Sequence, residues 1–328
     1  MRGYFDRMLA RWFLTVLLAS LPVSAVAATF TVDSTADAVD ANPGDGHCAT
    51  AAGQCTLRAA VQEANATPGA DTIMLPAGTY KLKLPGIDED EAASGDLDLT
   101  GDVTIVGAGS KTTFISAKKL KDRVFHVFGT ATVSGVTVRR GTAPAKEDGG
   151  GFLVVGSLSL SDVVVRGCST PADGAGIFAT GASVTIRDSM LVGNHAGHNS
   201  GGMEIDSGSA DLTRVVITKN GALNESGGLE VSASTATLTD CTIRGNHGVS
   251  DAGGVENEDG GRLTLTGCQV VGNHAKMGGG IATEDDPNFG PATTTISNTT
   301  VVKNATGNCL GAVVSLGGNH DSDGSCKF

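Results

Sequence analysis

Three glutamates recur at a constant interval in the second half of this 328-residue chain. Glu204, Glu230 and Glu256 are each 26 residues from the next. In Met203-Glu-Ile205 the glutamate stands between two apolar residues, which is the alternation of a β-strand with one face in an apolar core. The sequence therefore predicts one column of carboxylates on neighbouring strands, facing away from that core.

Metal binding is the chemistry that such a column would support. Like charges on adjacent strands are unfavourable by about 0.2–1 kcal/mol per pair unless solvent or a cation relieves the repulsion. A second acidic column, which includes Glu225 and Asp251, precedes the first, and oxygen ligands suit calcium rather than zinc. We therefore expect a calcium site with its centre at Glu230, or alternatively a solvated acidic face that binds no ion. The expected ligands are Glu204, Glu230, Glu256, Glu225 and Asp251.

Two further columns share the period and indicate which elements position the glutamates. One consists of asparagines and the other of glycines. The asparagines are Asn194, Asn220, Asn246, Asn273 and Asn304, and the glycines are Gly151, Gly176, Gly202, Gly228, Gly254 and Gly280. Each repeat holds three stretches too short for helices, and stacking them as three faces buries an apolar column that no single repeat could bury. The predicted fold is all-β, a single right-handed parallel β-helix with three sheets and coils of 26–27 residues.

Two columns have structural roles in this prediction. The asparagines would form a ladder of stacked amides without chemistry. A column of residues that tolerate a left-handed backbone marks a sharp bend between the second and third faces. Its members are Gly135, Asp162, Asp188, Arg214, Asp240, Gly267 and Asn298, of which only Arg214 is an unusual type for such a bend.

The ends of a solenoid need covering, and the sequence offers a device at each end. Thr56 is a predicted N-cap for a short helix with Leu57 and Val61 on its apolar face, ending before Pro68. Two cysteine pairs enclose short terminal segments, and we expect the disulfides Cys48–Cys55 and Cys309–Cys326. Cys241 and Cys268 share a column and are expected to be free thiols, and Cys168 has no evident partner.

The N-terminus predicts export. Arginines, an apolar run and Ala25-Val-Ala27 follow in the order of a cleavable signal peptide over residues 1–27. Its loss removes three Arg and one Asp from a chain of net charge −12, so the mature charge is −14. We expect no nucleic-acid partner and no transmembrane segment after cleavage. Residues 28–140 are expected to form the N-terminal cap and first coils, and residues 141–328 the regular coils and C-terminal cap.

The segment Cys55-Thr-Leu-Arg-Ala-Ala60 resembles the Cys-Ser-Leu-Arg-Glu-Ala motif of secreted bacterial β-helix proteins, with two positions different. Gly95-Asp-Leu-Asp98 and Val106-Gly-Ala-Gly109 also resemble that family. The tail, Leu316 to Cys326, resembles a segment that precedes an anchoring region in related proteins, so the family resemblance is to a choice-of-anchor type. The resemblance implies a pectate lyase-like β-helix and a secreted or periplasmic bacterial location, and it supplies no catalytic residues.

The acidic column and the β-helix favour two kinds of function. We expect an exported β-helix module whose acidic face binds extracellular or envelope glycans or other ligands, through calcium and without an organic cofactor. The alternative is a polysaccharide lyase or glycoside hydrolase, with Glu204, Glu230, Glu256, Lys219 and Arg244 as catalytic candidates. The paired-Asp and Gly-His-Gly motifs of polygalacturonases and the Arg signature of pectate lyases are absent from the sequence, so whether the chain is an enzyme stays open.

Overall fold

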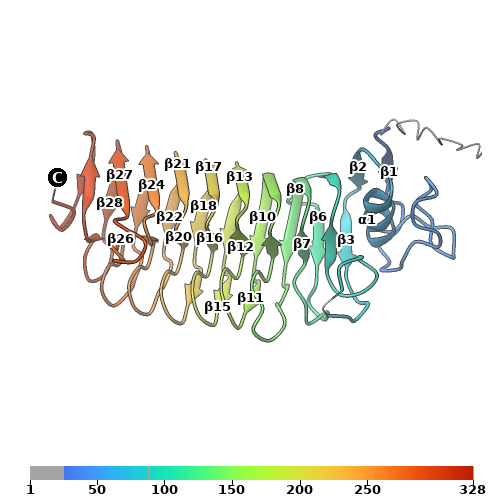
Figure 1. The fold of residues 1–328 in the computed structure, drawn as a ribbon, viewed down its shortest axis with the longest axis horizontal. Coiled ribbons are helices and arrows are strands. Elements are labelled where there is room, and N and C mark those ends of the chain that lie inside the picture. The colour runs from blue at the N-terminus through green and yellow to red at the C-terminus, as the bar shows by residue number, and fades with distance from the viewer. Residues whose placement is uncertain (1–25, 88, 328) are drawn as a thin grey trace, which may run out of the picture.

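A computed structural model describes residues 26–87 and 89–327. They form one elongated solenoid of parallel strands with a short helix at its N-terminal end, as Figure 1 shows. The predicted parallel β-helix is confirmed. Residues 1–25 of the predicted signal peptide lie outside the described residues. In the part of the chain that is described, no helix has the length and apolar character needed to cross a bilayer.

One face of the solenoid is a nine-stranded parallel sheet that carries the predicted glutamate column. Its strands are β4 (Leu97–Leu99), β7 (Phe125–Val127), β9 (Phe152–Val154), β12 (Ile177–Thr180), β16 (Met203–Asp206), β20 (Leu229–Ser232), β23 (Val255–Glu258), β26 (Ile281–Thr283) and β29 (Cys309–Leu310). Each strand pairs with the equivalent strand of the next coil, as Met203 does with Leu229. Equivalent positions therefore form columns along the long axis.

The other two faces join in one 19-stranded sheet. Its strands are β1 (Thr29–Thr31), β2 (Ala70–Leu75), β3 (Gly78–Lys81), β5 (Asp102–Gly107), β6 (Thr113–Ser116), β8 (Thr130–Arg139), β10 (Ser157–Arg166), β13 (Ser183–Arg187), β14 (Met190–Val192), β17 (Ser209–Thr213), β18 (Val216–Thr218), β21 (Thr235–Thr239), β22 (Thr242–Arg244), β24 (Arg262–Thr266), β25 (Gln269–Val271), β27 (Thr293–Ser297), β28 (Thr300–Val302), β30 (Val313–Ser315) and β31 (His320–Asp321). β8 and β10 run without interruption across the corner, which is why two expected sheets are continuous.

The corner between these two faces has the predicted backbone. All seven members of the column have positive φ, between 49° and 67°. Arg214, the unusual type, has φ 54° and donates two hydrogen bonds of 2.7 Å to the Asp188 carboxylate of the previous coil. This ion pair accompanies the arginine at a bend where Gly, Asp or Asn stands in the other coils.

The asparagine and glycine columns turn out to be in contact. Each asparagine side chain bonds to the next along the axis, as Asn220 Nδ2 does to Asn246 Oδ1 at 3.1 Å. A Cβ at Gly202 would lie 3.1 Å from Asn220 Nδ2 and 2.2 Å from Gly228 O. The two columns share one period because an amide occupies the space beside each glycine from Gly176 to Gly280, where the turn enters the nine-stranded sheet. A short three-stranded sheet lies within that turn: β11 (Ser169–Thr170), β15 (His195–Ala196) and β19 (Gly221–Ala222).

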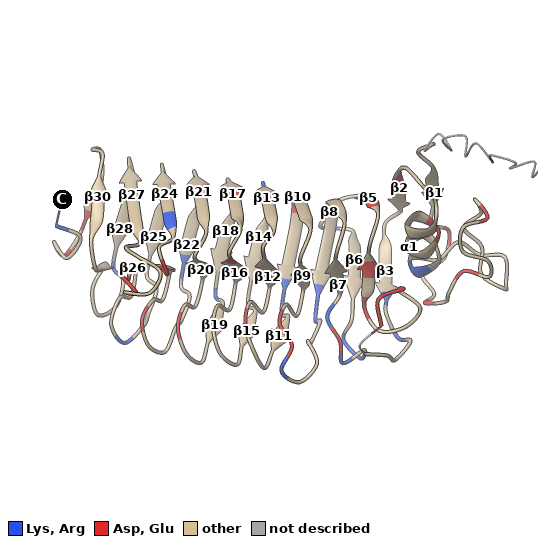
Figure 2. Ribbon diagram, in the orientation of Figure 1, with Lys and Arg blue, Asp and Glu red and all other residues tan. Residues whose placement is uncertain are grey.

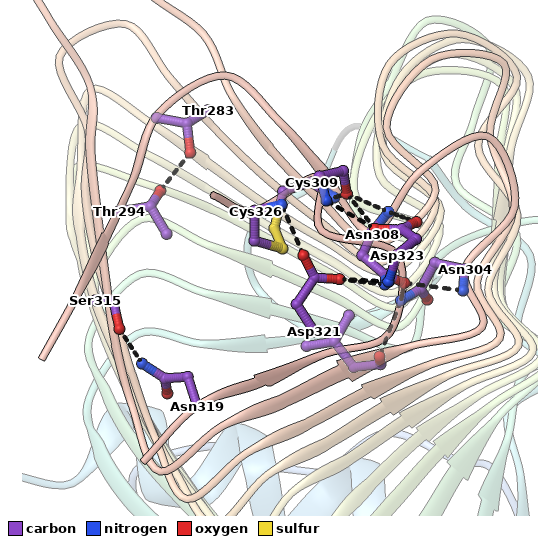
Figure 3. The surroundings of a disulfide bond; sticks show 12 residues. Thr283, Thr294, Asn304, Asn308, Cys309, Ser315, Asn319, Asp321, Asp323 and Cys326 are labelled. Atoms are coloured by element: carbon purple, nitrogen blue, oxygen red, sulfur yellow. Dashed lines mark hydrogen bonds between the residues drawn. A yellow bond between two sulfur atoms is a disulfide. The ribbon is translucent and has the colours of Figure 1, made fainter. Parts of the chain in front are cut away.

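Each end carries the device predicted from the sequence. Helix α1 (Leu57–Ala66) covers the N-terminal end, and its N-cap Thr56 accepts a bond from Ala59 N at 3.1 Å. The disulfides Cys48–Cys55 and Cys309–Cys326 are both formed. Figure 3 shows the second disulfide near Asn308, which continues the asparagine ladder and donates to Asp321 Oδ1 at 2.6 Å. Cys168, Cys241 and Cys268 are free and buried.

Candidate functional site

The outer column of the nine-stranded sheet brings together the predicted glutamates. Residues in register from β4 to β29 are Asp98, His126, Leu153, Phe178, Glu204, Glu230, Glu256, Ala282 and Leu310. Met203 and Ile205, on either side of Glu204, belong to the apolar core. The three glutamates therefore face away from the core on adjacent strands, as the alternation predicts.

The same glutamates are covered, so the expectation that they form a solvated face is wrong. Glu204 is 7% exposed, and Glu230 and Glu256 are 1% exposed. The turn that precedes each strand folds back over its outer face, where Ser226 Oγ donates to Leu229 O at 2.8 Å. Gly174 lies so close to β12 that a Cβ there would be 2.6 Å from Phe178 Cβ. Strand alternation predicts which side chains point away from the core. The path of the turn decides whether those side chains are exposed to solvent.

Burial leaves the column electrostatically unsatisfied. One carboxylate oxygen, Oε2, of each of the three glutamates is buried without a hydrogen-bond partner. Burial raises the pKa of Glu230 well above its usual value, and the carboxyls of Glu204 and Glu256 raise it further. Burial is also the largest cause of the raised pKa values of Glu204 and Glu256, and other nearby carboxylates raise both further. The folded column therefore favours a bound proton or a bound cation.

Glu256 is the centre of two possible ligand sets. One oxygen of each of Glu225, Glu256 and Glu258 lies within 4.8 Å of the other two, and the same holds for Asp251, Glu256 and Glu284. The first strand position after Glu256 that faces outward is Glu258, so period-two alternation could have indicated it. Glu284 is 26 residues after Glu258 and follows β26 in the same register, so the period of the repeat could have indicated it. Four of these carboxylates are half-buried and Glu256 is buried, so an ion could enter from solvent.

Three of the five expected ligands belong to these two sets, namely Glu225, Asp251 and Glu256. The other two members, Glu258 and Glu284, were not expected. Glu204 and Glu230 are in neither ligand set, although both lie in the same column. All ligands in these sets are carboxylate oxygens, which suit calcium or magnesium.

The basic catalytic candidates lie apart from the glutamate column. Lys219 lines an open depression of about 550 Å³ over the three-stranded sheet, together with His195 and His247. None of the three column glutamates lines this depression. Arg244 is exposed at the end of β22, on the other sheet. The structure therefore does not bring the five catalytic candidates into one groove.

A basic depression was not anticipated from the net charge. It has a volume of about 510 Å³ and is lined by Lys81, Lys83, Lys118, Lys119, Arg139 and Arg140, among others. Among the described residues, none of these six side chains has a carboxylate within ion-pair distance. Figure 2 shows Lys and Arg recurring along the long axis near the ends of strands. The pairs Lys118-Lys119 and Arg139-Arg140 were the sequence signal for this cluster.

Comparisons with known proteins found a family model and solved structures to which this chain is similar. The family model described as right handed beta helix region matches residues 157–324. The structure is similar to pectate lyase Pel9A, with 13% identity, 92% of this chain and 80% of that chain covered, and a TM-score of 0.49. It is also similar to the catalytic unit of a thermostable GH87 alpha-1,3-glucanase from Streptomyces thermodiastaticus strain HF3-3, with 13% identity, coverage of 94% and 72%, and a TM-score of 0.26. No curated protein matches the chain.

Proposed function

The chain belongs to the right-handed β-helix family, and on that premise we propose that it is an exported module that binds calcium along the outer face of its nine-stranded sheet. One observation carries the proposal. Glu256 Oε2 is buried and has no hydrogen-bond partner, and Glu256 is shared by two sets of closely spaced carboxylates. A divalent ion would convert their mutual repulsion into shared coordination.

The cation would also stabilise the stack of coils. Its ligands come from the coils that contain β20, β23 and β26 and from the turns before them, so one ion would link separate repeats of the solenoid. Binding to the folded state alone raises stability by mass action. Calcium would therefore act as a structural element of the surface that the module presents.

Export is part of the proposal and has three supports. The first 27 residues have the order of a secretory signal. Both terminal cysteine pairs are oxidised, which is typical of an oxidising compartment. The resemblance of Cys55 to Ala60 to the motif of secreted bacterial β-helix proteins agrees with a periplasmic or extracellular location.

Calcium titration of the chelator-treated protein tests the proposal. We expect calorimetric binding and a rise in melting temperature that Glu256→Gln reduces more than Glu230→Gln, because only Glu256 belongs to both ligand sets. Asp211→Asn is the matched control, since it removes one carboxylate at an exposed position of β17. Glu258→Gln, at a half-buried ligand, serves if Glu256→Gln fails to fold. No calcium binding at millimolar concentration, or equal calcium responses in all these variants, would reject the proposal.

Binding of an anionic glycan is a second candidate function, carried by the basic depression. Arg139 Nε is buried without a hydrogen-bond partner, and Arg139 lies over the Phe114 ring at 4.4 Å. Burial lowers the pKa of Arg139, and the neighbouring charges of Arg140 and Arg166 lower it further. Anionic groups on a polysaccharide would relieve this repulsion.

One binding screen tests this candidate function with three glycans: a polyuronate, a sulfated glycan and a neutral glucan. We expect the two anionic glycans to bind, and a Lys118→Ala/Lys119→Ala variant to bind them more weakly. Equal retention of the neutral glucan would contradict the candidate. Incubation in the same screen tests the enzyme alternative, because a lyase would release unsaturated products and a hydrolase would release reducing ends.

A further inference from the structure

A second cluster with metal-binding chemistry lies on the same outer column, toward the N-terminal end. Asp98 on β4 and His126 on β7 are paired in register, and Asp90 belongs to the preceding loop. One ligand atom from each of the three residues lies within 4.8 Å of the other two. Leu153 and Phe178 separate this cluster from Glu204 along the column, so the two acidic groups are chemically independent.

The distances fit a shared ion better than direct bonds. His126 Nδ1 lies 3.8 Å from Asp98 Oδ1 and 3.9 Å from Asp90 Oδ1, which is too long for hydrogen bonds. Two ligands bonded to one tetrahedral zinc ion at about 2.1 Å are about 3.4 Å apart. Small side-chain movements would therefore bring the three atoms to coordination distance.

One ligand atom is buried and has no partner. The Asp98 side chain is fully buried, and its Oδ2 accepts a hydrogen bond of 2.8 Å from Ala92 N. Its other oxygen, Oδ1, has no hydrogen-bond partner and is the oxygen nearest to His126 Nδ1. A buried carboxylate oxygen without a partner is costly, so this atom itself indicates a missing ligand.

The loop that carries Asp90 is held firmly. Arg58, fully buried on α1, donates to the carbonyl oxygens of Ala92, Ser94, Gly95 and Asp96. Glu89 accepts bonds from the backbone N–H groups of residues 91, 93 and 94. The motif that resembles the secreted β-helix family therefore contributes the arginine that fixes this loop. Such outer contacts orient the ligands of a metal site.

From these contacts we propose that Asp90, Asp98 and His126 form a binding site for a transition-metal ion, with zinc as the expected ion. An imidazole nitrogen with two carboxylates is a donor set for zinc and related ions, whereas calcium and magnesium prefer oxygen alone. Asp90 is 71% exposed, so the site is open to solvent and three protein ligands leave a position for water or an external ligand.

The surroundings of His126 favour its role as a ligand. The His126 side chain is 14% exposed, and its Nδ1 is the atom that approaches both carboxylates. The Phe128 ring packs against the imidazole with a centroid distance of 3.8 Å, which restricts its orientation.

Zinc titration of the untagged, chelator-treated full chain tests the site by calorimetry. We expect one zinc ion that excess calcium does not displace, and Co²⁺ should give visible absorption bands of a nitrogen-containing site. Asp90→Asn and His126→Gln should each weaken zinc binding by about tenfold or more, since even loss of outer contacts has effects of this size. Asp90 is exposed, so its substitution should leave the fold intact.

Two controls separate this site from others. His47→Gln removes an exposed histidine elsewhere and should leave zinc binding unchanged. Glu256→Gln should reduce the calcium response without changing zinc affinity, so the two metal proposals can fail independently. Unchanged zinc affinity in both Asp90→Asn and His126→Gln, or full displacement of zinc by calcium, would overturn the proposal.

Discussion

Replacement of Asn220 by alanine tests whether the asparagine ladder holds the coils together. Asn220 is 2% exposed and lies within the ladder, between Asn194 and Asn246. Its Oδ1 accepts bonds from Asn194 N at 2.9 Å and Asn194 Nδ2 at 3.1 Å. Its Nδ2 donates to Leu191 O at 3.0 Å and Asn246 Oδ1 at 3.1 Å. At a net value of about 1 kcal/mol for each bond, Asn220→Ala should lower the free energy of unfolding by about 4 kcal/mol.

Equilibrium urea unfolding followed by far-ultraviolet circular dichroism measures this loss. The control is Asn288→Ala, because Asn288 is exposed and its side chain bonds only to Asp286 in its own loop. We expect the control to change stability by less than about 0.5 kcal/mol. Equal slopes of the two unfolding curves are needed for the comparison. If Asn220→Ala lost no more than Asn288→Ala, the ladder would not have the structural role assigned to it.

Three further predictions follow from packing and titration. Gly202→Ala should lower the melting temperature in calorimetry, because the new Cβ would lie 2.2 Å from Gly228 O. Gly101→Ala should be tolerated, because the atom nearest to its new Cβ is 3.5 Å away. Equal effects of the two substitutions would contradict this packing argument. The three free thiols are buried, and burial raises the pKa of Cys168 to about 12, so an alkylating reagent should label none in the native protein and all three after unfolding without reductant. Burial raises the pKa of Asp96 to about 8 and that of Glu258 to about 7. Such carboxyls bind protons in the folded state that the unfolded chain has released, so their stabilisation is complete below about pH 4 and is lost as the pH rises through about 7 to 8. Urea unfolding of the chelator-treated protein should therefore show lower stability at about pH 8.5 than at about pH 5, and a flat profile would contradict the assigned shifts.

The repeated part of the fold was predictable because its period is a property of the backbone. Every coil must turn the same corner, so a residue at positive φ recurs there, and even Arg214 follows the rule. The alternation in Met203-Glu-Ile205 likewise predicted which way Glu204 points. The helix from Leu57 and both terminal disulfides followed from local capping and spacing.

Exposure and the grouping of ligands depended on the tertiary structure. The turn before each strand covers the glutamate column, and the alternation within the strands does not describe the path of that turn. Asp90 meets Asp98 and His126 through a loop held by Arg58, and this loop is not part of the repeat. Sequence by itself determined the stacking of the coils, because equal coil length places equal residues above one another. Only the tertiary structure decided which carboxylates are buried and which meet, because irregular turns place them by contacts that are distant in the chain.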